Sequence, residues 1–259
     1  MYGVMCAVVC TIARKERRKT MEETYVRCCA VCCVLVYCSV LLPTQTRRCL
    51  PPSLQRAFER LTGHTLILED CLEVTGLRID EVVEHNFRKL GGWDESDPER
   101  TRAAVAKAIV DEMEQLLSTE AEPMAGLDEA LAFIKAQGVR LAVASSSPMR
   151  LIEAGLKRLG LDDGVFEVTC SAQFEALGKP HPGVYLTCCA KLGVEAHRCV
   201  AIEDSLNGVI AAKAGRLRCI AVPSVEDRER PAFAVADAKL ESLVGIDAEV
   251  WNSLGFATV

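Results

Sequence analysis

Polar residues cluster at three points in the second half of the chain, each beside a predicted apolar strand. Ser145–Ser147 follow one strand directly, Lys179 lies in the loop after the next strand, and Glu203 and Asp204 end a third. Ligands of open α/β sheets bind beyond the carboxyl ends of the strands, so we expect the three clusters to lie together. Hydroxyls, an ammonium group and two carboxylates in one place predict a site for phosphate and a metal cation.

Each cluster also has a purely structural interpretation. Ser147 could cap the following helix, and Asp204 could cap the helix predicted to begin at Ser205. Lys179 could be a solvated loop lysine. The combination favours a functional site, because two adjacent acids at the end of a buried strand are costly unless a cation or hydrogen-bond donors satisfy them.

The predicted roles follow from the chemistry of each group. Ser145 and Ser146 offer hydroxyls to an anionic oxygen, and Lys179, held in a loop with two prolines, offers a positive charge. Glu203 and Asp204 supply the hard oxygen ligands that Mg²⁺ prefers. We therefore predict Mg²⁺ as the cofactor and a small phosphate ester as the partner.

The elements that must position these residues alternate after Glu122. Short continuous apolar runs predict strands, and longer runs with helical spacing predict helices. The predicted strands are Leu141–Ala144, Val165–Thr169, Cys199–Ile202 and Arg218–Val222. The predicted helices are Leu127–Gln137, Pro148–Leu159, Val184–Leu192 and Ser205–Ala214. This alternation predicts an α/β fold, a Rossmann-like parallel sheet covered by helices on both faces.

Residues 51–121 predict a separate, helical unit. Val82, Val83 and Phe87 recur at helical spacing, and Thr101–Leu117 is a long amphipathic stretch with no strand signal nearby. We expect a small all-helical cap over residues 51–121, inserted near the N-terminus, and an α/β core over residues 122–259.

Residues 1–50 differ in composition from the rest, holding eight of the fourteen cysteines. Cys28–Leu42 is an uncharged, mostly apolar run, shorter than the about 20 residues that span a bilayer. Three interpretations of this run are open. It is a signal or anchor segment, it is a buried central strand over Val31–Leu42, or it is not authentic coding sequence. Cys29 and Cys32 have metal-site spacing, but no second ligand pair follows, which favours ordinary apolar thiols.

Charge narrows the range of partners. The formal net charge of -6 and the single short basic run Arg14–Lys19 give no reason to expect nucleic acid. The later cysteines lie in apolar surroundings, as reduced cytosolic thiols do. We predict a cytoplasmic protein with no membrane partner unless residues 28–42 form an anchor.

The three clusters resemble motifs of the haloacid dehalogenase-like phosphatases. Val143–Pro148 is similar to the second motif, Gly178–Pro182 to the third and Ile202–Gly208 to the fourth. The resemblance implies that Ser145 binds phosphate, that Lys179 is the catalytic lysine, and that Asp204, with Glu203 beside it, binds Mg²⁺. It covers about residues 51–245.

Within that family the chain resembles the branch with β-phosphoglucomutase and the bacterial 2-deoxyglucose-6-phosphate and hexitol-phosphate phosphatases. Thr75–Asp80 is similar to part of the helical cap in that branch, which makes Arg78 a candidate substrate contact. The resemblance implies hydrolysis of hexose or hexitol phosphates. A phosphosugar mutase is an alternative.

The family's first motif, an Asp-x-Asp after the first strand, has no counterpart near the N-terminus. Its two carboxylates would supply the nucleophile and the general acid/base. The sequence has no aspartate before Asp70, and neither Cys38 nor Ser39 replaces a pair of carboxylates. The first core strand is therefore expected to be degenerate or replaced. A lost or misread first exon and a non-catalytic phosphate-binding protein are both consistent with this departure.

Overall fold

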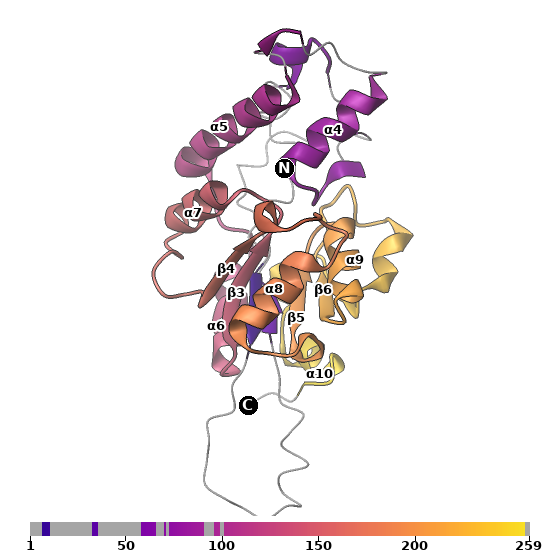
Figure 1. Cartoon of the computed structure of the whole chain (residues 1–259). Coiled ribbons are helices and arrows are strands. Elements are labelled where there is room, and N and C mark those ends of the chain that lie inside the picture. The colour runs from indigo at the N-terminus through magenta and orange to yellow at the C-terminus, as the bar shows by residue number, and fades with distance from the viewer. Residues whose placement is uncertain are drawn as a thin grey trace, which may run out of the picture.

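The computed structural model describes residues 58–65, 70, 73–90, 96–98 and 101–256 in full, and the backbone alone of residues 7–10 and 33–35. An α/β body forms the larger part, and the helices α4 and α5 stand above one edge of its sheet (Figure 1). The predicted division between a helical cap and an α/β core at residue 121 falls between α5 and α6.

The described strands form one sheet in which β4, β3, β2, β5, β6 and β7 lie side by side and parallel. The strands are β1 (Ala7–Cys10), β2 (Cys33–Leu35), β3 (Arg140–Ser145), β4 (Val168–Ser171), β5 (Val200–Glu203), β6 (Arg218–Ala221) and β7 (Ala238–Lys239). The predicted parallel α/β sheet is thus confirmed.

The backbone of β2 pairs with both β3 and β5, which is the central position expected for the Val31–Leu42 run. The remainder of that run, the membrane-segment prediction for residues 28–42, and Cys29, Cys32, Cys38 and Ser39 lie outside the described residues. None of the helices in the described ranges is long and apolar enough to cross a bilayer.

Strand β1 departs from the parallel pattern. It pairs antiparallel with β3, Ala7 opposite Val143, and it also pairs antiparallel with β5. A strand's direction depends on how the chain connects it to its neighbours and not on its own residues, so an apolar run carries no directional signal.

Strand β4 begins later than the predicted strand Val165–Thr169. The structure pairs Val168–Ser171 with β3, and Ser171 lies opposite Ser145. Val165 and Phe166 instead pack against the hydrophobic core from the preceding turn. Their apolar character therefore reflects burial and not strand pairing.

Helices cover both faces of the sheet. They are α6 (Leu127–Ala136), α7 (Met149–Arg158), α8 (Gly183–Leu192), α9 (Leu206–Ala214) and α10 (Ala248–Ser253), with 3-10 turns at Ala172–Phe174, Ala196–Arg198, Pro231–Val235 and Leu243–Gly245. Alternate strand residues face opposite sides. Leu141 and Val143 face the α6, α7 and α10 side, whereas Ala142 and Ala144 face the α8 and α9 side.

The two faces differ in side-chain type. The α8 and α9 side is built largely from alanines and cysteines. Its cluster holds every cysteine of the described residues whose side chain is placed and buried: Cys170, Cys188, Cys189, Cys199 and Cys219. Small side chains allow α8 and α9 to pack close to the sheet, where the site residues are found.

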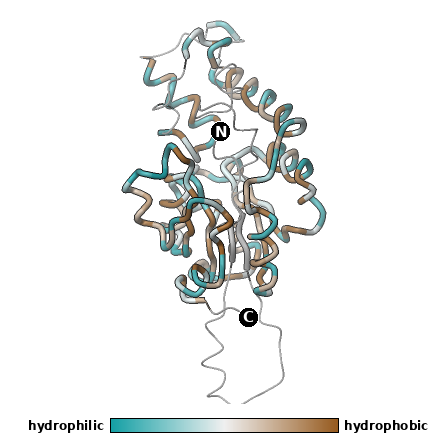
Figure 2. Tube along the Cα trace, turned by 180° about the vertical axis from the view of Figure 1, so that it is seen from behind, coloured by the Kyte–Doolittle hydropathy of each residue, from teal (hydrophilic) through white to brown (hydrophobic). Residues whose placement is uncertain are grey.

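The cap contains α4 (Ile79–Lys89) and α5 (Arg102–Glu120), which pack against each other. The long helix alternates between hydrophobic and hydrophilic stretches (Figure 2), as an amphipathic helix does. Thr101 caps α5 by accepting a hydrogen bond from the N–H of Ala104. Because α5 also packs on α7 of the core, the cap is seated on the edge of the sheet where β3 ends.

Candidate functional site

The three predicted clusters meet at the carboxyl edge of the sheet. Ser145 is the last residue of β3, Glu203 is the last residue of β5, and Lys179 reaches the same place from the loop between β4 and α8. All three side chains are buried. The sequence prediction that these clusters lie together agrees with the structure, while the roles of the residues stay predictions.

Lys179 and Glu203 form a buried ion pair. The Nζ of Lys179 lies 2.5 Å from Oε1 of Glu203, and the hydroxyl of Tyr185 donates a hydrogen bond to the same oxygen. The ammonium group also stands 4.8 Å from the centre of the Tyr185 ring. A buried carboxylate needs such partners, because removing it from water is otherwise costly.

The second oxygen of Glu203 is also engaged. Ser205 donates its hydroxyl to Oε2 of Glu203 over 3.2 Å. A Cβ atom at Gly208 would lie 2.1 Å from the Glu203 carboxyl carbon, so α9 approaches this group as closely as only glycine allows. The predicted role of Glu203 as a metal ligand stays a prediction, and its contacts give it the further task of orienting Lys179.

Asp204 is buried beside this pair. It does not cap the following helix: Ser205 does, accepting a hydrogen bond from the N–H of Gly208, and α9 begins at Leu206 and not at Ser205. The capping interpretation of Asp204 was therefore wrong. The hydroxyl of Ser205, one residue after Asp204, makes the N-cap hydrogen bond of α9. The Asp204 carboxylate instead lies at the end of β5.

The serines make the turn from β3 to α7. Ser145 Oγ accepts a hydrogen bond from the N–H of Ser147, and Ser146 donates its hydroxyl to the carbonyl of Gly76 in the cap over 2.6 Å. The carbonyl of Ser147 accepts a hydrogen bond from Ser171. The interpretation of Ser147 as the N-cap of α7 was wrong. Pro148 is the N-cap residue, its ψ is extended, and the helix begins at Met149.

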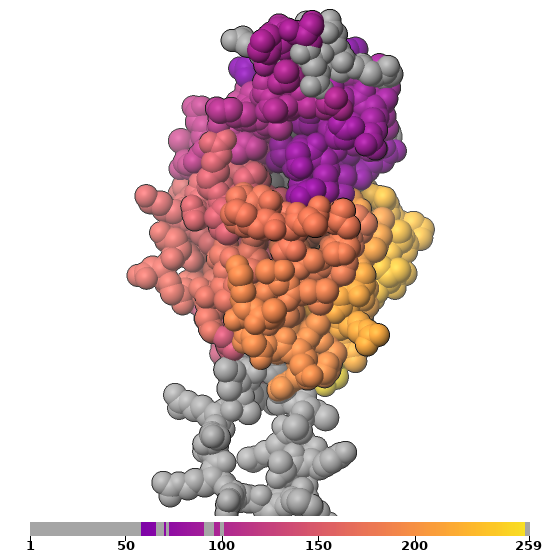
Figure 3. All heavy atoms as spheres, in the orientation of Figure 1, coloured from indigo at the N-terminus to yellow at the C-terminus, as the bar shows by residue number. Residues whose placement is uncertain are grey.

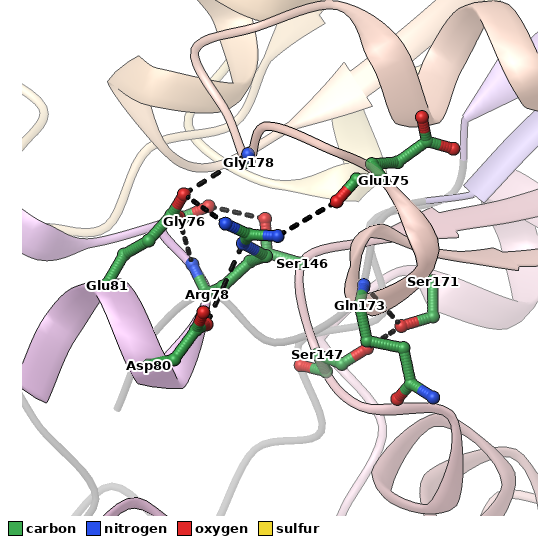
Figure 4. A network of polar contacts seen from close by, with 10 residues as sticks. All are labelled: Gly76, Arg78, Asp80, Glu81, Ser146, Ser147, Ser171, Gln173, Glu175 and Gly178. Atoms are coloured by element: carbon green, nitrogen blue, oxygen red, sulfur yellow. Dashed lines mark hydrogen bonds and ion pairs between the residues drawn. The ribbon is translucent and has the colours of Figure 1, made fainter. Parts of the chain in front are cut away.

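Arg78 stands at the N-terminal end of α4, facing the core. Its Nη1 donates to the carbonyl of Glu175 over 3.0 Å, and its Nη2 donates to Glu81 over 2.8 Å (Figure 4). Glu175 belongs to the same loop as Lys179. The structure thus brings the predicted substrate contact to the loop that carries the predicted catalytic lysine.

Three contributors to this site were missed at the level of sequence. Tyr185 lies in the predicted helix Val184–Leu192, and nothing in the sequence pointed to its hydrogen bond with Glu203. Asn207 donates its amide to the carbonyl of Thr75 over 2.9 Å, and its place within the Ile202–Gly208 motif was the available signal. Glu81 had no signal beyond its place in the first turn of a predicted helix.

A magnesium ion fits the chemistry of this edge only through a small set of ligands. Within the described ranges, no group of three or more His, Cys, Asp or Glu side chains is arranged to hold a metal. Mg²⁺ usually keeps several waters and takes one or two carboxylates together with phosphate oxygens. Asp204 supplies one such carboxylate at the buried end of β5, so the donor set is compatible with that arrangement.

A parallel sheet covered on both faces, with a helical cap above an edge of serine, lysine and acidic side chains, is the architecture of a capped Rossmann-like hydrolase. The family model of haloacid dehalogenase-like hydrolases matches residues 44–216. This chain belongs to the haloacid dehalogenase-like hydrolases.

Individual relatives confirm the branch expected from the motifs. Hexitol phosphatase B from Escherichia coli (strain K12) is 41% identical over 179 residues, covering 68% of this chain and 77% of that protein. The "phosphorylated carbohydrates phosphatase" of Thermotoga maritima is 34% identical over 148 residues, covering 56% of this chain and 68% of that protein.

Solved structures agree on the fold. CbbY from Rhodobacter sphaeroides, solved in complex with phosphate, aligns with a TM-score of 0.65 and 29% identity over 75% of this chain and 87% of its own. β-Phosphoglucomutase from Clostridium difficile aligns with a TM-score of 0.64 over 78% of this chain and 90% of its own, and its 18% identity bears on the fold alone.

Proposed function

We propose that this chain is a Mg²⁺-dependent phosphomonoester hydrolase scaffold for small sugar phosphates, either hexose or hexitol phosphates. The observation that carries the proposal is the buried Lys179–Glu203 pair beside Asp204, at the edge of the sheet covered by the cap. The phosphatase relatives named above support the choice of substrate class.

Each residue has a definite task in this proposal. Lys179 neutralises a phosphate oxygen, with its direction set by Glu203 and Tyr185. Ser145 and Ser146 bind the phosphate at the end of β3, and Arg78 meets the organic half of the substrate from the cap. Asp204 would hold Mg²⁺, which when bound would neutralise charge on the transferring phosphoryl group.

The sequence also favours a second candidate, a protein that binds the phosphate ester without turning it over. The resemblance to the family implies that hydrolysis needs a carboxylate nucleophile from an Asp-x-Asp motif near the N-terminus. The first aspartate of this sequence is Asp70. Asp70 is engaged by Lys89 of α4 over 2.9 Å, on the cap. We therefore expect phosphate binding at the site with little hydrolysis by the chain of this sequence.

Isothermal titration of the full chain separates these possibilities. The titrants are Mg²⁺ together with a hexose 6-phosphate or a hexitol phosphate, and released phosphate is assayed in parallel. Binding that Lys179→Met abolishes supports the proposal, and release of phosphate would establish a hydrolase. Isomerisation of the ester without phosphate release would establish a mutase, and absence of binding would overturn the proposed site.

A further inference from the structure

A crevice lies where the cap meets the core, directly beside the predicted phosphate-binding serines. Its volume is about 340 Å³, and its polar lining consists of Arg78, Asp80, Lys107, Ser146, Arg150 and Gln173. Figure 3 shows the cap and the core meeting along a seam. A phosphate ester bound at Ser145 and Lys179 would extend its organic half into this space.

Two of the three cations in the lining are paired with carboxylates. Lys107 lies 2.7 Å from Asp111, and Arg150 bonds to Asp111 and to Glu114, the latter over 3.0 Å. The hydrogen bonds from Lys107 and Arg150 hold the pKa of Asp111 below its ordinary value, so this carboxylate is ionised at neutral pH. This wall of the crevice therefore carries no excess of positive charge.

The third cation, Arg78, is neutralised by Glu81. One Glu81 oxygen accepts from Nη2 of Arg78 over 2.8 Å and from the N–H of Gly178 over 3.2 Å. The other accepts from the backbone N–H of Arg78 over 3.0 Å. Figure 4 shows Glu81 lying between the guanidinium and the loop that leads to Lys179.

The fit around Glu81 is close. A Cβ atom at Gly178 would lie 2.2 Å from a Glu81 carboxylate oxygen, so the lysine loop can approach the cap only with a glycine at this position. Asp80 adds a second carboxylate 3.7 Å from Nε of Arg78. This buried Nε has no hydrogen-bond partner among the described residues.

We propose that Glu81 is a specificity-determining residue that cancels the charge of Arg78, so that the crevice accepts the uncharged, hydroxyl-bearing half of a sugar monophosphate and disfavours a second phosphate. The inference rests on the proposed function and narrows its substrate class. A second phosphate brings a charge of about -1.5 to -2 at neutral pH. It would face the Asp80 carboxylate in the lining and an Arg78 whose charge Glu81 already cancels. Sugar hydroxyls can both donate to the Asp80 carboxylate and accept from Arg78.

The test compares Glu81→Gln with Glu84→Gln as a matched control on the same helix. The glutamine at position 81 keeps an oxygen that can accept from Gly178 but removes the charge that masks Arg78. Glu81 pairs with Arg78, which lines this crevice, whereas Glu84 pairs with Arg88 and Arg102, which do not. Titration of each full-length variant with a hexose 6-phosphate and with a hexose 1,6-bisphosphate gives the ratio of the two affinities.

The unmodified chain is expected to bind the monophosphate at least as tightly as the bisphosphate. Glu81→Gln should shift the ratio about tenfold toward the bisphosphate, whereas Glu84→Gln should leave it unchanged. A native preference for the bisphosphate, or an unchanged ratio in Glu81→Gln, would overturn the inference while the proposed function stood. Binding of neither ester would overturn both.

Discussion

Two groups of ion pairs, one in the core and one on the cap, use the same chemistry in opposite surroundings. Lys179 and Glu203 lie 2.5 Å apart with 4% and 1% of their side chains exposed. On the cap, Glu84 pairs with Arg102 over 2.6 Å and with Arg88 over 2.8 Å, and the Arg88 side chain is 78% exposed. Distance alone therefore does not distinguish the two groups.

Burial decides what each pair does. In the core, water cannot replace a lost partner, so removing one charge leaves the other uncompensated. On the cap, water and salt replace either partner at little cost. The core pair is consequently suited to hold a lysine in one direction for phosphate, and the cap pairs are expected to contribute little to stability.

The largest expected effect comes from breaking the core pair. Lys179→Met should lower the free energy of unfolding by about 3–5 kcal/mol and abolish phosphate binding, because Glu203 is left as a buried, unpaired carboxylate. Urea unfolding and titration with phosphate measure the two effects. Adding Glu203→Gln should recover part of the stability but none of the binding. A stable single variant that still binds phosphate would contradict this account.

A smaller loss is expected from crowding the same pair. Gly208→Ala places a methyl group against the Glu203 carboxyl, and overpacking of this kind costs roughly 1–3 kcal/mol. Phosphate affinity should fall with stability because Glu203 orients Lys179. Thermal unfolding and phosphate titration of this variant check the result. Unchanged stability would mean that Glu203 can move aside. The buried Lys179–Glu203 pair would then tolerate disturbance as the exposed ion pairs of the cap do, which would contradict the contrast drawn above.

Asp237 lies between the two extremes of burial. Burial raises the pKa of Asp237, but hydrogen bonds from Lys213 and from the N–H of Cys219 outweigh it, so the net pKa is lowered. A lowered folded-state pKa gives stability that is present above about pH 4 and is lost as the pH falls further. Asp237→Asn should cost roughly 1 kcal/mol at pH 7 and flatten the stability profile below pH 4. Urea unfolding from pH 3 to pH 7 checks this, and parallel profiles for both proteins would contradict it.

The smallest effect is expected on the cap surface. Hydrogen bonding to Arg102 lowers the pKa of Glu84, yet water reaches all three side chains: Glu84 is 34% exposed, Arg102 49% and Arg88 78%. Glu84→Ala should shift the unfolding midpoint only slightly at low salt and not at all in 1 M salt. A salt-independent loss as large as that of Gly208→Ala would show that exposure does not separate the two groups of pairs.

Local sequence patterns predicted the elements well where neighbouring residues determine them. The long helix predicted over Thr101–Leu117 and the strand predicted over Leu141–Ala144 were both found from spacing and composition. Residues at strand ends were also brought together correctly, because parallel strands share one carboxyl edge.

The contacts between cap and core could not be predicted in the same way. Gly178 and Glu81 are 97 residues apart in sequence, and Ser146 and Gly76 are 70 apart. Their contact depends on how α5 packs on α7, which no local pattern encodes. Strand β1 was not predicted, and its antiparallel direction depends on the chain connection and not on residue type.

The unequal distribution of cysteines makes the two faces of the sheet chemically distinguishable. The five thiols of the α8 and α9 side are buried, and burial raises the pKa of Cys219 well above its ordinary value. The core cluster on the α6, α7 and α10 side contains none of the described cysteines. The rate at which these five thiols are alkylated in the folded protein, measured for each peptide by mass spectrometry, would therefore report how often the α8 and α9 side opens. It would give no signal from the α6, α7 and α10 side.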